Sequence, residues 1–160
     1  MSQTPDFEHE RHREAYERVA EYLDELFEDA LEDQGHFYVR YGSTVLEIAI
    51  EPYGPDESSV IIMSYCVQGA EVDEDLRTGL LELNHDLPFG AFSIVGSDIF
   101  FSHALFGRTL QRTNLLGAIA AVAETSDRYD DLIAEKYGGE RALDRIQHTG
   151  GREGRKRSTN

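Results

Sequence analysis

The feature of the sequence that most constrains the fold is a junction where a helical pattern passes directly into a strand pattern. Asp73 can cap a helix, and four leucines follow it at helical spacing: Leu76, Leu80, Leu83 and Leu87. Pro88 disfavours helical geometry at the residue before it, so the helix is predicted to end there. Residues 92–95 and 99–105 are rich in β-forming side chains and flank a Gly96-Ser97 turn, which predicts a hairpin. This combination indicates an α+β domain.

A long first helix is predicted from an apolar stripe that follows Pro5. The stripe recurs at three- and four-residue steps, through Tyr16, Val19, Ala20, Leu23, Leu26, Phe27, Ala30 and Leu31. Gly35 is placed to end this helix in the left-handed conformation. The other helix faces carry acidic side chains from Glu17 to Asp33, and we interpret them as a solvated face rather than a docking site for a basic partner.

Three strands are predicted next, over residues 37–41, 44–51 and 60–67. The first two alternate apolar and other side chains on either side of a Gly42-Ser43 turn. The third is β-rich on both faces, which is typical of a central strand. The sequence therefore predicts an antiparallel meander after the first helix.

The last predicted helix runs from near Leu110 to Tyr137, and Gly138-Gly139 ends it. We expect one domain over residues 5–139 and a disordered basic tail over residues 140–160. The cations of the tail favour transient self-association with the acidic first helix over nucleic-acid binding; they are Arg152, Arg155, Lys156 and Arg157.

Charge and composition exclude several classes of protein. The 160 residues carry a formal net charge of −16, which repels phosphate backbones, so we expect no nucleic-acid partner. The longest apolar run, residues 115–123, is far shorter than the roughly 20 residues of a membrane span, and no basic-then-apolar leader follows Met1. A cytoplasmic protein without membrane contact is therefore expected. Cys66 is the one cysteine, which excludes an internal disulfide, and we interpret it as a buried hydrophobe.

Searching for chemistry gives no catalytic constellation. The most enzyme-like cluster is Asn84, His85 and Asp86, with His103 brought near by the following hairpin, but short polar residues at a helix end also satisfy its last carbonyls. His9 and His12 are one helical turn apart without a third metal ligand. The sequence predicts no enzyme, no metal and no cofactor.

The order helix, three strands, helix, two strands, helix resembles the type III secretion chaperone-like (CesT-like) fold, in particular the YbjN family. The residues that carry this resemblance are 80–93, whose motif positions are Asn84, Pro88, Phe89, Gly90 and Phe92, then the hairpin ending at His103, and Tyr137-Gly138-Gly139. The resemblance implies a five-stranded antiparallel sheet with packed helices, commonly in a homodimer. It also implies a non-catalytic chaperone or adaptor that holds a segment of a client protein without ATP.

The strands carry surplus apolar side chains that could line a peptide groove, although core packing is an alternative use: Val45, Ala49, Ile61, Met63 and Tyr65. A dimer interface is expected either on the helix bearing Leu76, Leu80 and Leu83 or on the small-residue face of the last helix, at Gly117 and Ala121. Three alternatives remain open. They are a regulator acting through the charged first helix, a ligand-sensing domain, and a hydrolase using His85, Asp86 and His103.

Overall fold

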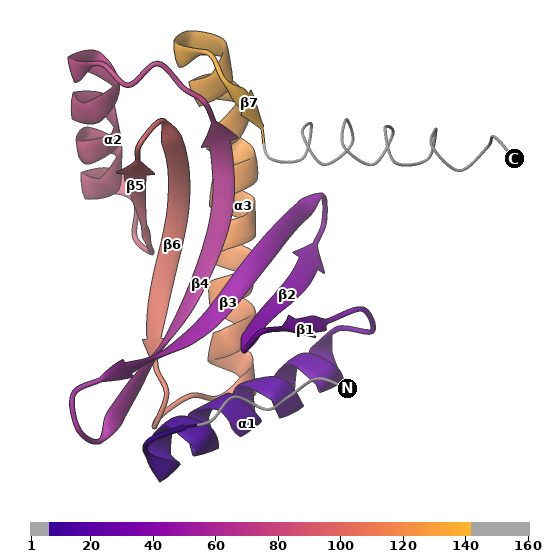
Figure 1. The fold of residues 1–160 in the computed structure, drawn as a ribbon. Helices are drawn as coiled ribbons and strands as arrows, with labels where there is room; N and C mark the ends of the chain where they lie inside the picture. The colour runs from indigo at the N-terminus through magenta and orange to yellow at the C-terminus, as the bar shows by residue number, and fades with distance from the viewer. Residues whose placement is uncertain (1–6, 142–160) are drawn as a thin grey trace, which may run out of the picture.

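One antiparallel sheet runs through the computed structural model, which describes residues 7–141 (Figure 1). In chain order the elements are α1 (Glu10–Leu26), β1 (Leu31–Asp33), β2 (His36–Tyr41), β3 (Thr44–Tyr53), β4 (Glu57–Gln68), α2 (Glu74–Asp86), β5 (Ala91–Val95), β6 (Asp98–Phe106), α3 (Arg112–Tyr137) and β7 (Glu140–Arg141). The α+β class is confirmed. The predicted number of strands is wrong, because the described chain forms seven strands and not five.

The strands follow the order β1-β2-β3-β4-β6-β5, and β7 pairs with β4 as well. The third predicted strand, β4, is central, with β3 on one side and β6 on the other. Pairing between β3 and β4 reaches Ser64, and β7 takes the following positions, Val67 and Gln68. The last residues of β4 are therefore paired by β7, the short strand that follows α3.

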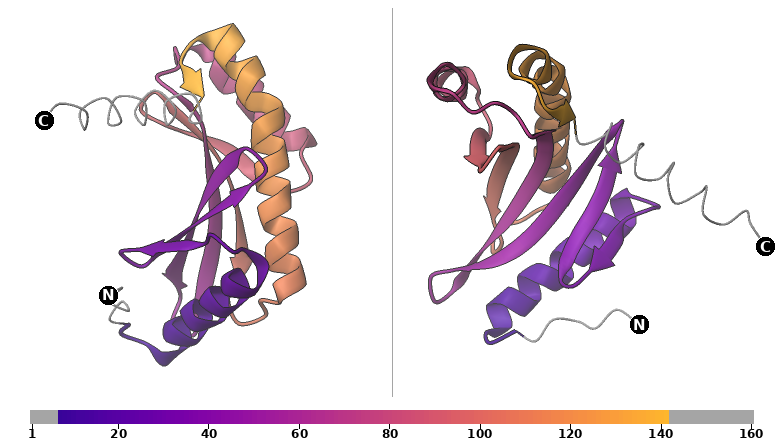
Figure 2. Two further views of the ribbon diagram at one scale, coloured as in Figure 1. Left: turned by 90° about the vertical axis from the view of Figure 1, so that its right-hand side faces the viewer. Right: turned by 45° about the horizontal axis from the view of Figure 1, so that its top comes forward.

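The core lies on one face of this sheet. β4 alternates fully buried with partly exposed side chains up to Tyr65, and its buried set points at α1 and α3. Figure 2 shows α3 running along the sheet and α1 crossing its lower end. The core cluster includes Val19 and Leu23 of α1, Leu115 and Ile119 of α3, and Ile62 of β4. Both helices therefore cover the same face.

The first helix is shorter than predicted. It ends at Leu26, because Phe27 is already extended, with φ −135° and ψ 126°. Leu31, which the apolar stripe assigned to the helix, lies in β1 and is 67% exposed. Gly35 is left-handed as predicted, at φ 84°, but together with Gln34 it forms the two-residue turn between β1 and β2.

The chain after α3 also differs from the prediction at its first two positions. Glu140 and Arg141 form β7, where a disordered tail was expected to begin, and the rest of that tail lies outside the described residues. Gly138 and Gly139 end α3 with φ values of 75° and 89°, and they turn the chain onto β4. Arg141 is held there by an ion pair of 2.9 Å with Asp131 of α3.

Replacing Gly139 with alanine is expected to destabilise the protein more than the same change at Gly138. A Cβ at Gly139 would lie 2.6 Å from the Gln68 carbonyl oxygen, whereas a Cβ at Gly138 would meet nothing within 4 Å. Both variants carry a positive-φ penalty of about 1–3 kcal/mol, and overpacking adds about 1–3 kcal/mol at Gly139 alone. Urea unfolding should show this difference. Equal losses in the free energy of unfolding would contradict close packing between β7 and β4.

Candidate functional site

The face of the sheet opposite α1 and α3 carries no helix in the described chain, and we call it the open face. All five residues predicted to line a peptide groove lie on it, because each occupies the alternate register to the buried positions of β3 or β4. They are Val45, Ala49, Ile61, Met63 and Tyr65. Tyr65 is 36% exposed and the other four are partly exposed, and none belongs to the buried core. These apolar side chains are therefore available to a partner.

Aromatic residues extend the open face at both ends. Tyr65 and Phe100 pack with ring centroids 4.2 Å apart, and the Tyr65 hydroxyl donates a 2.8 Å hydrogen bond to Asp98. At the other end Tyr53 and Phe106, 62% and 59% exposed, pack with their rings tilted and the centroids 6.2 Å apart. Sequence reasoning named Tyr65 but missed Tyr53, Phe100 and Phe106. The signal was the register of the hairpin, which places alternate residues of β6 beside β4.

The middle of the open face leaves space beside its large side chains, because small side chains flank them on the neighbouring strands. Ile61 pairs with Ala49 on β3 and with Ala104 on β6, so its flanks are open on both sides. Met63 pairs with Glu47 and Ser102, which brings one carboxylate into the apolar row. The open face thus combines shallow apolar depressions with polar side chains at its margin.

A free strand edge borders this surface. β5 stops pairing at Ser102, so β6 beyond that point has β4 on one side and no strand on the other within the described chain. By the alternation of an antiparallel ladder, the N–H and C=O groups of Ala104 and Phe106 face outward. An extended peptide lying across the open face can therefore reach unpaired backbone groups as well as apolar side chains.

The motif residues hold the junction between α2 and the hairpin together. The Asn84 side chain accepts a 2.7 Å hydrogen bond from the Phe92 N–H and donates a 3.1 Å hydrogen bond to the Phe92 carbonyl. These are the two bonds that a neighbouring strand would supply. A Cβ at Gly90 would lie 2.7 Å from the Phe101 ring and from the Ser102 carbonyl oxygen, so this position requires glycine.

The rest of the motif is also structural. Leu87 is extended, with φ −78° and ψ 130°, as the following Pro88 predicts. Phe89 is 58% exposed and packs edge-on against the His103 ring, with centroids 5.9 Å apart. The motif therefore builds the turn that places β5 beside α2.

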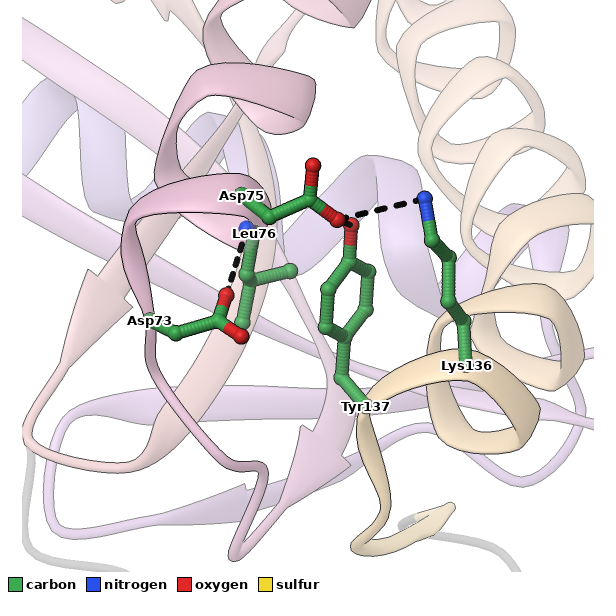
Figure 3. Close-up of polar contacts among 5 residues, drawn as sticks. All are labelled: Asp73, Asp75, Leu76, Lys136 and Tyr137. Carbon is green, nitrogen blue, oxygen red and sulfur yellow. Dashed lines mark hydrogen bonds and ion pairs between the residues drawn. The ribbon is translucent and has the colours of Figure 1, made fainter.

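Polar contacts fix the first turn of α2 against the end of α3 (Figure 3). Asp73 caps the helix as predicted and accepts a 2.8 Å hydrogen bond from the Leu76 N–H. The Asp75 carboxylate accepts a 2.8 Å hydrogen bond from the Tyr137 hydroxyl and lies 3.3 Å from the Lys136 ammonium. Both contacts hold the pKa of Asp75 below its usual value. The orientation of α2 is thus set at both of its ends.

The predicted dimer residues lie in different environments. Leu76 and Leu80 are 1% and 5% exposed, so within this chain their side chains belong to the core and do not face outward. Leu83 is half-buried, and the leucine that α2 does expose is Leu81, at 71%. On α3, Gly117 is exposed and Ala121 is half-buried.

The candidate catalytic residues do not converge on a cleft. His85 and Asp86 are exposed at the end of α2, while His103 is half-buried on β6 against Phe89. His12 is buried, and its Nε2 donates to the Glu57 carbonyl 3.0 Å away. Residues 7–141 contain no group of three or more histidine, cysteine or acidic side chains placed to hold a metal ion. They also contain no helix long and apolar enough to cross a membrane.

Cys66 lies buried in a small polar cluster under α3. Its sulfur is 3.0 Å from the Ser126 hydroxyl oxygen, which shares a 2.7 Å hydrogen bond with Ser64. Burial raises the pKa of the Cys66 thiol to about 12, so the thiolate needed for redox or nucleophilic chemistry is not formed near neutral pH. The prediction that Cys66 is buried is confirmed.

Comparison with known proteins identifies the family. A family model described as "T3SS (YopN, CesT) and YbjN peptide-binding chaperone 1", abbreviated TY-Chap1, matches residues 13–145. The chain belongs to the TY-Chap1 family. The resemblance drawn from the sequence is thereby confirmed, and the TY-Chap1 assignment favours a chaperone over an enzyme. No curated protein sequence matches the chain.

Solved structures share the TY-Chap1 fold at low sequence identity. "Crystal Structure of the ExsC-ExsE Complex" aligns with a TM-score of 0.59 at 9% identity, over 76% of this chain and 95% of that chain. "Structure of the HopA1-SchA Chaperone-Effector Complex" aligns with a TM-score of 0.56 at 7% identity, over 74% and 96%. An uncharacterized protein from Methanothermobacter thermautotrophicus aligns with a TM-score of 0.54 at 19% identity, over 78% and 99%. At these identities the likeness shows the fold alone.

Replacing Asn84 with aspartate is expected to lower the free energy of unfolding by about 1–3 kcal/mol. The carboxylate still accepts from the Phe92 N–H but cannot donate to the Phe92 carbonyl, which is left facing a negative charge. Thermal unfolding measured at pH 7 checks this. Asp86→Asn, a change of the opposite charge sign at an exposed position two residues away, is the control and should leave the unfolding temperature unchanged within 1 °C. An Asn84 variant as stable as wild type would show that its side chain is not a strand substitute.

Proposed function

We propose that this TY-Chap1 protein is a non-catalytic chaperone or adaptor that holds an extended segment of a client protein on the open face, without ATP. The observation that carries the proposal is the uncovered apolar row along β4, where Ile61, Met63 and Tyr65 occupy successive outward positions. The free edge of β6 beside this row supplies backbone hydrogen bonds. Recognition of a peptide by strand addition uses these two features: a free strand edge that hydrogen-bonds the peptide backbone, and adjacent apolar positions that contact its side chains.

The chemistry of the open face also suggests which segments it holds. Ala49 and Ala104 leave space on both sides of Ile61, which fits aliphatic or aromatic client side chains at alternate positions. Each such side chain contributes roughly 1.5–3 kcal/mol when fully buried. Three of them supply about 4.5–9 kcal/mol before the cost of ordering the client is subtracted, which is well short of the roughly 12 kcal/mol of nanomolar binding. That strength suits a holder that must later release its client.

A homodimer in the cytoplasm is the second part of the proposal, and the exposed side of α2 is its proposed interface. Leu81 is 71% exposed and lines a shallow groove of about 420 Å³ between α2 and β5, together with Ile94 and Arg77. A second copy placed there would bury Leu81 and leave the open face accessible. This interface lies on the same helix that the sequence predicted, but on its exposed side, because Leu76 and Leu80 pack into the core.

Replacing Met63 with aspartate is expected to weaken client binding at least tenfold. The probe is a fluorescent peptide selected against the wild-type protein from a random 15-residue library, and its dissociation constant is measured by anisotropy with and without ATP. Leu132→Asp makes the same chemical change at a 56% exposed position on the outside of α3 and should change the constant less than twofold. Equal affinities for the two variants, or a dependence on ATP, would contradict the proposal.

Replacing Leu81 with aspartate is expected to convert a dimer into a monomer. The substitution puts two like charges into a symmetric interface and removes its largest exposed apolar side chain. Light scattering coupled to size exclusion at micromolar concentration reports the mass, with Leu132→Asp again as control. A Leu81→Asp variant that is still dimeric would show that the interface lies elsewhere. A monomeric wild-type protein would contradict the homodimer proposal.

A further inference from the structure

One carboxylate lies inside the apolar row of the open face, and it belongs to Glu47 of β3. Its register partners are Tyr38 of β2 and Met63 of β4, and Val45 and Ala49 are its neighbours on the same face of β3. The Glu47 side chain is 29% exposed. A carboxylate among apolar side chains is costly unless a donor or a cation accompanies it. The partner of Glu47 therefore affects what the open face can bind.

The partner that the chain itself supplies is a histidine. The His36 ring contacts the Glu47 carboxylate directly through Nδ1, and the His36 side chain is 41% exposed. A neutral imidazole can give a carboxylate one hydrogen bond, whereas an imidazolium gives it a hydrogen bond and a positive charge. Histidine is the side chain that ordinarily exchanges these two states between about pH 5 and 8. Protonation of one ring therefore sets the charge in the middle of the open face.

The other ionisable groups around this pair do not supply Glu47 with a cation. Asp33 of β1 is the register partner of His36 and adds a second negative charge. Arg40 is exposed on β2 and takes part in no ion pair within residues 7–141. Burial, and then the Glu47 and Asp33 carboxylates, raise the pKa of the Tyr38 hydroxyl, as nearby negative charge does. With a neutral His36, the Glu47 carboxylate is therefore open to a cation from outside.

We propose that Glu47 selects client segments in which a lysine or arginine lies between two aliphatic residues, and that protonation of His36 cancels this preference. The inference rests on the proposed function of the open face. Ile61, Met63 and Tyr65 are successive outward positions of β4, so a client strand along β4 places alternate side chains over them. Aliphatic residues cover Ile61 and Tyr65. The stem of the lysine between them covers Met63 while its ammonium reaches Glu47.

The pH dependence follows from competition between two cations for one carboxylate. At neutral pH the imidazole is uncharged, and the client cation meets the Glu47 carboxylate without competition. As the pH falls, protonation of His36 puts a second cation on the same carboxylate, and like charges oppose the lysine. A client with leucine at the central position is not opposed in this way, since a neutralised pair is less costly to cover than a bare carboxylate. Acid therefore shifts the preference toward wholly apolar segments.

The chain's own surfaces fit this position less well than a separate client does. A second copy would present the same Asp33 and Glu47 carboxylates, and a symmetric contact brings like charges together. The C-terminal segment of the chain contains Leu143 and Arg145 at the required spacing, but Gln147 stands where the second aliphatic residue is needed. Charge and spacing together therefore favour a segment of a partner protein.

The test uses the full-length protein and two fluorescein-labelled peptides at 150 mM salt. One is Ser-Val-Ser-Leu-Thr-Lys-Thr-Leu-Ser-Val-Ser, and the other has leucine in place of the lysine. Anisotropy gives the ratio of the two dissociation constants, leucine peptide over lysine peptide. In the wild type this ratio is expected to fall at least tenfold from pH 7.5 to pH 5.5. Burial raises the pKa of Asp130 on α3 to about 6, but the ratio cancels its effect because both peptides bind the same protein.

Two variants assign the effect to its residues. Glu47→Gln is expected to lower the ratio at pH 7.5 at least fivefold and to remove its pH dependence. His36→Gln keeps a donor beside the carboxylate but carries no charge, so the ratio should stay within twofold of its pH 7.5 value down to pH 5.5. The matched controls change the same residue types at exposed positions of α2, as Glu82→Gln and His85→Gln, and should behave like the wild type.

Three results would overturn the inference. Equal changes of the ratio in Glu47→Gln and Glu82→Gln would show diffuse attraction to a polyanion. A pH dependence that is absent from the wild type, or that survives His36→Gln, would exclude His36 as its cause. A gain above fivefold in affinity for the lysine peptide on Arg145→Gln would assign the site to the chain's own C-terminal segment. In all three cases the proposed function stands if Met63→Asp weakens both peptides, whereas peptides that bind Met63→Asp as tightly as the wild type would contradict the proposed function itself.

Discussion

The alternation of side chains along β4 divides this protein into a core side and a partner side. From Ser58 to Tyr65 every second residue of that strand is buried under α1 or α3, and the residues between them point to the open face. Because the side-chain period of a strand is two, a slip of one residue would exchange Ile62 for Ile61 and reverse both sides at once. β3, β6 and β7 all pair with β4 and keep its register in place. Core and candidate function thus depend on the same ladder.

In this architecture the motif residues have structural roles, and other residues form the candidate binding surface. The motif around Asn84 and Gly90 builds a turn, and the glycines after Tyr137 dock a strand, so the most recognisable positions are structural. The candidate binding surface uses residues outside those motifs, on β4 and the strands beside it. The same frame can therefore carry surfaces of different charge and depth. Family membership accordingly fixes the fold more tightly than the partner.

Patterns with several periods were predicted correctly, and isolated segments were not. α2, the β5–β6 hairpin and α3 each repeat their apolar spacing, so their elements were found near their observed bounds. β1 has three residues and continues the helical stripe of α1 through Leu31, so local periodicity favoured the wrong structure. β7 is two charged residues that form a strand only because β4 has unpaired groups beside them.

Cys66, buried in its polar cluster between β4 and α3, can report on the separation of α3 from the sheet. The thiol lies between the central strand and α3, and its pKa of about 12 keeps it protonated as well as covered. A thiol reagent can reach it only when α3 lifts from the sheet or the whole domain unfolds, because both layers shield the sulfur. The rate at which this single cysteine is modified therefore measures how often the two layers separate. A client that stays on the open face would leave that rate unchanged, unless holding it also tightens the sheet against its helices.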